Sequence, residues 1–70
     1  MEKWILISVI DREIMTEECE TLLEAQGKME EELNMYADPE CDEYELEETG
    51  GWANGRDGDV HCDWKIIKIL

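Results

Sequence analysis

The sequence predicts an α+β fold in which a four-stranded antiparallel sheet carries one helix on one face, in the chain order ββαββ. Three observations support this. Short apolar segments of strand length lie near both ends, a central segment has apolar residues at helical spacing, and the acidic segment after it alternates like a half-buried strand. At 70 residues the chain is expected to form one domain, residues 1–70, with too small a core to enclose a deep substrate cavity.

The first two strands are expected before the helix. The run "KWILISVID" is apolar and β-branched, and it is short enough to be a strand covered on both faces or nearly so. Asp11 and Arg12 then mark a turn, and "REIMTEECE" is the returning strand.

A helix is expected to begin at Thr21. Thr21 followed by Glu24 fits a capping box, in which the hydroxyl accepts a backbone N–H and the glutamate reaches back to the cap. Pro39 disfavours helical geometry before it, so the helix should end by about Ala37. Steps of three and four place the apolar residues of this segment on one stripe, which comprises Leu22, Ala25, Met29, Leu33 and Tyr36.

Two residues inside this helix need an explanation. Lys28 lies four residues after Glu24 and four before Glu32, so it is expected to pair with one of them. Gly27 is unfavourable in a helix interior by about 1 kcal/mol relative to alanine. Its presence indicates either a close approach to the sheet or a soft point in the helix.

The remaining two strands are expected on either side of a glycine-rich segment. In "DPECDEYELEETGG" the glutamates at 43, 45 and 47 alternate with Tyr44 and Leu46, which predicts a strand with a carboxylate face. The last strand is "VHCDWKIIKIL". Between them, "GGWANGRDGDV" contains Asn54-Gly55 and Asp57-Gly58, dipeptides that favour positive φ in hairpin turns.

The charge of the chain is concentrated in its middle. The net charge is −14 at pH 7. Residues 17–49 have a net charge of −13 and residues 1–16 of −1, whereas the charges of residues 50–70 sum to zero. A field of one sign repels nucleic acid and anionic membrane surfaces, so direct binding to either is not expected.

No catalytic residue, metal site or cofactor is predicted. Neither aspartate-containing segment has the ligand spacing of an EF-hand, and the glycines lead into a strand rather than into a phosphate-binding helix. His61 and Cys62 are neighbours on a strand and point to opposite faces. Three cysteines at no zinc-like spacing indicate reduced thiols. The first apolar run is too short to span a bilayer, which predicts a cytoplasmic protein.

The order of elements also resembles a group of known sequences. The segments "WILISVIDREI", "ETLLEAQGKMEEEL", "GGWANG" and "DWKIIKI" are similar to small uncharacterised proteins of gut Firmicutes, their phages and mobile elements. The resemblance covers nearly the whole chain and implies a bacterial or phage cytosolic context, but no functional residue is carried over. In general character the chain also resembles phage-encoded inhibitors, such as anti-CRISPR and anti-restriction proteins and the uracil-DNA glycosylase inhibitor, which are commonly acidic nucleic-acid mimics.

The functional prediction follows from the acidic surface. We expect a non-enzymatic binding protein whose carboxylates occupy the basic nucleic-acid-binding surface of a host defence or DNA-processing protein. Tyr44 and Trp52 are the candidate aromatic anchors. The alternative is a homodimer whose acidic surface only keeps it soluble. The carboxylates predicted to bind the partner lie in the helix and the acidic strand, and they are Glu24, Glu31, Glu32, Asp42, Glu43, Glu45, Glu47 and Glu48.

Overall fold

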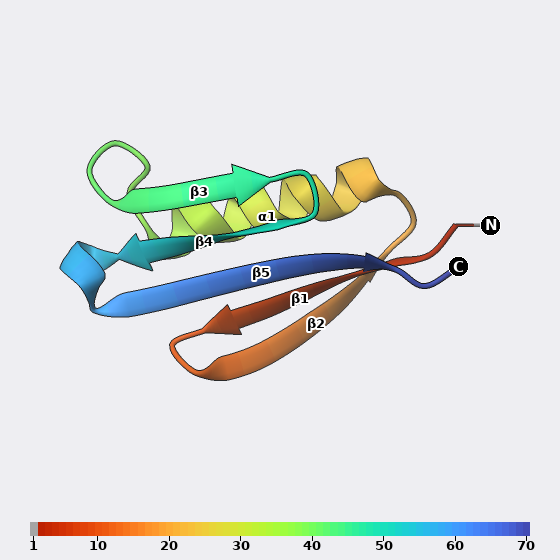
Figure 1. Cartoon of the computed structure of the whole chain (residues 1–70), viewed down its shortest axis with the longest axis horizontal. Coiled ribbons are helices and arrows are strands. Elements are labelled where there is room, and N and C mark those ends of the chain that lie inside the picture. The colour runs from red at the N-terminus through yellow and green to blue at the C-terminus, as the bar shows by residue number, and fades with distance from the viewer. Residues whose placement is uncertain (1) are drawn as a thin grey trace.

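A five-stranded antiparallel sheet with one α-helix across one face forms the fold in the computed structural model, which describes residues 2–70 (Figure 1). The strand order across the sheet is β2-β1-β5-β4-β3. The elements in chain order are β1 (Trp4–Ile10), β2 (Glu13–Cys19), α1 (Leu22–Tyr36), β3 (Glu43–Glu47), β4 (Gly50–Gly55), the 3₁₀ turn η1 (Arg56–Gly58) and β5 (Val60–Lys68). The predicted α+β class, antiparallel sheet and single α-helix are confirmed, whereas the prediction of four strands is wrong.

The fifth strand is β4, which sequence reasoning took for a turn. Asn54 and Gly55 do not form a hairpin turn but end this strand, and Gly55 has φ −83°. The glycine serves close packing instead, because a Cβ on Gly55 would collide with the backbone carbonyl oxygen of Tyr36 at the end of α1. A glycine-rich strand has little intrinsic β-propensity, and its pairing with β3 and β5 determines its conformation.

The connections around β4 therefore differ from those expected. Glu48 and Thr49 form the turn between β3 and β4, and η1 connects β4 to β5. The expectation of positive φ is confirmed at Gly58, which has φ 92°, and Arg56 also has a positive φ of 52°. The side chain of Asp57 lies outside the described part of the structure.

The helix has the predicted start and end. The backbone N–H of Glu24 donates to the Thr21 hydroxyl at 3.0 Å, and the Glu24 carboxylate accepts the N–H of Glu20 at 2.9 Å. The carboxylate thus reaches one residue further back than in the usual capping box. At the other end Ala37 caps α1, and its N–H donates to the carbonyl of Leu33.

The core lies between α1 and the sheet. Ala25, Met29 and Leu33 of the helix are buried against the sheet, and Leu22 and Tyr36 pack at the ends of this stripe, as predicted. The sheet residues of the core all project toward the helix. They are Leu6 and Ile10 of β1, Cys19 of β2, Ala53 of β4, and Cys62, Trp64 and Ile66 of β5.

Two expectations about the helix interior are corrected. Lys28 does not pair with Glu24 or Glu32, because its Nζ lies 2.8 Å from the Glu17 carboxylate of β2. Gly27 does not approach the sheet, because a Cβ placed on it would have no neighbour within 4 Å. The remaining interpretation, a soft point on the exposed side of the helix, fits its position.

The face of the sheet opposite α1 has no covering element within residues 2–70, and we call it the open face. In Figure 1 the helix lies behind the sheet, and both chain ends meet at one end of the strands. β1 is apolar on both faces, as its sequence predicts, but only one face is covered by the helix.

Candidate protein-binding face

Residues of all five strands meet on the open face in transverse rows. One row runs across the sheet through Ile14, Val9, Asp63, Trp52 and Glu45, which are successive cross-strand partners. The face is apolar over β1 and at Ile14 of β2, mixed over β5 and acidic over β3.

The acidic side is a row of three carboxylates, Glu43, Glu45 and Glu47, which we call the acidic row. They alternate on β3 with residues that face the helix layer, so all three project from the open face. Alternate residues of a strand repeat every ~6.7 Å. All three side chains are exposed, and no ion pair or side-chain hydrogen bond within residues 2–70 engages them. The acidic row is thus an unneutralised, regularly spaced line of charge on a rigid strand.

Trp52 lies directly beside the acidic row. It is the cross-strand partner of Glu45 on one side and of Asp63 on the other, and its side chain is half-buried. A hollow of about 230 Å³ adjoins it, with Glu47, Gly50 and Lys65 among its lining residues. A partner side chain that enters this hollow can contact the indole ring.

A cluster of three polar side chains on β5 and β4 lies between the apolar and the acidic sides of the open face. The ring of His61 has Nδ1 2.6 Å from Asn54 Oδ1 and Nε2 2.9 Å from Asp63 Oδ2. His61 and Cys62 project to opposite faces, as predicted, since Cys62 is fully buried on the helix side. The histidine thus orders acceptor groups near the start of β5 and does not meet the neighbouring thiol.

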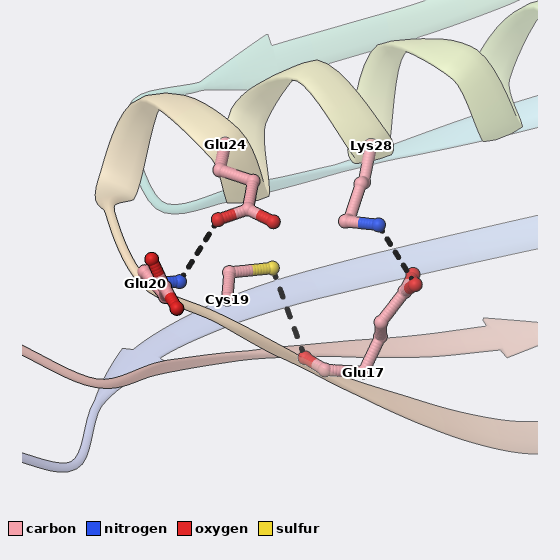
Figure 2. Close-up of polar contacts among 5 residues, drawn as sticks. All are labelled: Glu17, Cys19, Glu20, Glu24 and Lys28. Atoms are coloured by element: carbon pink, nitrogen blue, oxygen red, sulfur yellow. Dashed lines mark hydrogen bonds and ion pairs between the residues drawn. The ribbon is translucent and has the colours of Figure 1, made fainter.

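The predicted helix carboxylates lie in the other layer. Glu24 is engaged at the start of α1 by the Glu20 N–H, next to Cys19 and the Lys28–Glu17 pair (Figure 2). The hydrogen bond with Glu17 raises the pKa of Lys28. These groups stabilise the corner between β2 and α1 and are separated from the acidic row by the sheet.

The remaining predicted carboxylates are divided between structural contacts and solvent. Glu32 accepts a hydrogen bond from the indole N–H of Trp64 at 3.0 Å. Asp42 accepts the N–H groups of Asp38 at 2.7 Å and Arg56 at 3.2 Å. Glu48 lies in the turn after β3, and its carbonyl accepts the side chain of Gln26. These contacts organise turns and the helix–sheet interface.

Two predicted residues are exposed but away from the open face. Glu31 projects from the helix, and Tyr44 lies on the helix side of β3, where it is the cross-strand partner of Ala53. Of the ten predicted binding residues, the structure brings together four: Glu43, Glu45, Glu47 and Trp52.

The cysteines are thiols at three separate places. Burial raises the pKa of Cys19 and of Cys62, and both are buried on the helix side. Cys41 is exposed, and its Sγ donates to Asp38 Oδ2 at 3.1 Å, which lowers the pKa of that carboxyl. Among the described residues, no three histidine, cysteine or acidic side chains are arranged to hold a metal ion.

Sequence reasoning missed the apolar side of the open face. Apolar side chains from three adjacent strands form this surface, which we call the apolar stripe and which consists of Ile5, Ile7, Val9, Ile14 and Ile67. Ile14 is 72% exposed and Ile67 41% exposed. The signal was present in β1, whose odd-numbered residues are as apolar as its even-numbered ones although the chain has one helix to cover the sheet.

Comparison of the chain with models of protein families, with curated proteins and with solved structures finds no match. None of the helices within residues 2–70 has the length and apolar character needed to cross a membrane.

Proposed function

We propose that this protein is a non-enzymatic binding protein that occupies a basic, nucleic-acid-binding surface of another protein and so competes with nucleic acid for it. The observation that carries the proposal is the acidic row, with its exposed carboxylates and without cationic partners in the described chain. A groove that binds nucleic acid presents lysine and arginine to a line of negative charge, and the acidic row offers such a line.

The fixed geometry of the acidic row supports this function over simple solubility. The three carboxylates stand on a hydrogen-bonded strand that pairs with β4 along its whole length. Binding to a rigid array loses less conformational entropy than binding to mobile side chains of a loop. Complementary charge accelerates association and makes it dependent on salt.

Trp52 supplies the apolar contact that charge alone lacks. Interface energy concentrates in a few buried aromatic and arginine side chains, and charged rims add mainly to rate and specificity. Trp52 stands between Glu45 and Asp63, so a partner arginine that pairs with either carboxylate can also stack on the indole ring. The target that we propose is a bacterial DNA-processing or defence protein, which is the context that the resemblance to small proteins of Firmicutes and their phages implies.

Displacement from DNA tests the proposal directly. Proteins of a Firmicutes lysate are bound to DNA–cellulose at low salt and eluted with this protein. We expect selective elution of a DNA-binding protein at low salt, and no elution of that protein by Glu45→Lys/Glu47→Lys. The complex between the eluted protein and this protein should weaken as salt is raised, because its contacts are charged. The matched control is Glu30→Lys/Glu31→Lys, which makes the same charge change on the exposed side of α1 and should elute like wild type. Elution by Glu45→Lys/Glu47→Lys equal to that by wild type, or a complex whose affinity does not depend on salt, would rule out mimicry.

A further inference from the structure

The open face carries an apolar surface that the proposed function does not use. The apolar stripe joins the acidic row across β5 and β4, so one flat surface presents isoleucine and valine at one side and carboxylates at the other. The largest apolar patch on the surface of a monomeric protein often has a function.

The size of the apolar stripe limits what can cover it. Three strands at a spacing of ~4.8 Å and seven residues at ~3.3 Å cover about 300 Å². The apolar stripe occupies part of this area, because β2 and β5 each contribute one residue to it. A stable protein interface buries about 800 Å² on each partner. An occupant of ordinary size must therefore extend past the apolar stripe over β4 and β3, where it meets Trp52 and the acidic row.

The charge of the open face determines which partner of that size can bind it. In a face-to-face dimer of this chain, a two-fold axis places β3 over either the β3 or the β2 of the second copy. The open-face side chains of β2 are Ile14, Thr16 and Glu18, and the open-face lysine of the sheet, Lys65, stands on the central strand β5. In neither arrangement does the strand opposite the acidic row carry a cation. Burial of unpaired carboxylates is strongly unfavourable, and each copy carries a net charge of −14. A second copy is therefore disfavoured.

We infer that the open face binds a cationic amphipathic protein segment, whose apolar side chains cover the apolar stripe while its lysines or arginines pair with the acidic row. The inference rests on the proposed function in taking the acidic row as a partner-binding surface, and it adds the chemistry of the partner. A groove that binds only nucleic acid would present cations and no apolar side chains. The partner defined by the whole open face presents an apolar ridge alongside them.

Two synthetic helical peptides with the same number of lysines test the inference. The face opposite the lysines is leucine in one peptide and glutamine in the other, and both are titrated into ¹⁵N-labelled protein. We expect the leucine peptide to bind at least about tenfold more tightly, since the burial of one leucine side chain is enough for such a gain in affinity. Amide shifts should change on β1 and β4 together.

Variants on each side of the open face separate the two contributions. Val9→Thr/Ile14→Thr keeps β-branched residues in the strands and should reduce the difference between the peptides. Glu45→Gln/Glu47→Gln should weaken both peptides. The controls are Leu23→Thr, which changes a leucine 78% exposed on α1, and Glu30→Gln/Glu31→Gln; neither should alter the tenfold preference.

Three results would overturn the inference: equal affinity for both peptides, a leucine preference that is unchanged in Val9→Thr/Ile14→Thr, or a dimer in sedimentation that these substitutions dissociate. Ile14→Thr alone, at an exposed edge position, serves if the double variant fails to fold. Failure here with successful displacement from DNA leaves the proposed function intact. The expected peptide preference without any displacement supports the cationic amphipathic partner and rejects nucleic-acid mimicry.

Discussion

The two faces of this sheet consist of alternating residues of the same strands, yet they differ in what covers them. On the helix side, Leu6 is fully buried, as are Ala25, Ala53 and Cys62. On the open face, Ile7 follows Leu6 directly in the chain and remains partly exposed. The difference shows that apolar residues on both faces of a strand do not mean that the chain itself buries both faces. Here α1 buries one face and leaves the other partly exposed to solvent.

The largest expected difference between the faces is in core stability. Leu6→Ala should lower the free energy of unfolding by about 2–5 kcal/mol, because it opens a cavity under the helix. Ile7→Ala should lower it by about 1 kcal/mol or less, because solvent already reaches that side chain. Urea denaturation followed by circular dichroism measures both.

Equal losses in the two variants would contradict this comparison. They would mean that the open face is covered in solution, and repeating the denaturation over a range of protein concentrations would show whether a second copy covers it.

Two glycines extend the comparison to the backbone. Gly55→Ala should destabilise the protein by about 1–3 kcal/mol, because the new methyl group meets the Tyr36 carbonyl where α1 packs on β4. Gly27→Ala should stabilise it by about 1 kcal/mol, because its methyl group enters open space on the outer side of the helix. Thermal denaturation of the two variants gives both signs, and a loss of stability in Gly27→Ala would refute the soft-point interpretation.

These glycines also show how far sequence reasoning reached. Capping by Thr21 and the helical stripe depend on residues close in the chain, so their spacing predicts them. Strand β4 depends on long-range pairing with β5 and on the approach of α1 to Gly55. No local pattern in "GGWANG" encodes that approach, and the turn propensity of Asn54-Gly55 pointed to the wrong structure.

The candidate site was predictable in part for the same reason. Alternation along β3 places Glu43, Glu45 and Glu47 on one face whatever the tertiary structure. The pairing of β3 with β4 determines which face of the sheet these carboxylates occupy. It also places Trp52 on the same face and Tyr44 on the opposite one. Composition alone could not separate the acidic row from Glu24 and Glu32, whose carboxylates have structural partners.

The two thiols buried between α1 and the sheet make the stability of the protein depend on pH in the alkaline range. Burial raises the pKa of Cys19 and Cys62 in the folded protein above that of the unfolded chain. Their contribution to stability is therefore present below the unfolded thiol pKa, about 8.5, and is lost as pH rises through the folded values. The raised pKa of Lys28 acts in the same direction. We expect the urea midpoint to fall above about pH 8.5.

Alkylation provides the matching measurement at each thiol. Near pH 8, iodoacetamide should modify the exposed Cys41 first, and Cys19 and Cys62 only as fast as the protein unfolds. Mass spectrometry of digested samples gives the rate at each cysteine. Rapid modification of Cys62 in the native protein would show that the helix side is open to solvent.

The smallest expected effect concerns the acidic row and ionic strength. Residues 17–49 carry a net charge of −13, so screening of their mutual repulsion should stabilise the fold. Raising NaCl from low to near-molar concentration should increase Tm by about 4–8 °C, which corresponds to about 1 kcal/mol for a domain of this size. Glu45→Gln/Glu47→Gln should reduce this increase, because it removes two neighbouring charges that have no cationic partner within residues 2–70. A Tm that falls with salt would mean that exposed pairs such as Lys28–Glu17 outweigh the repulsion, and the acidic row would then have no measurable cost in folding.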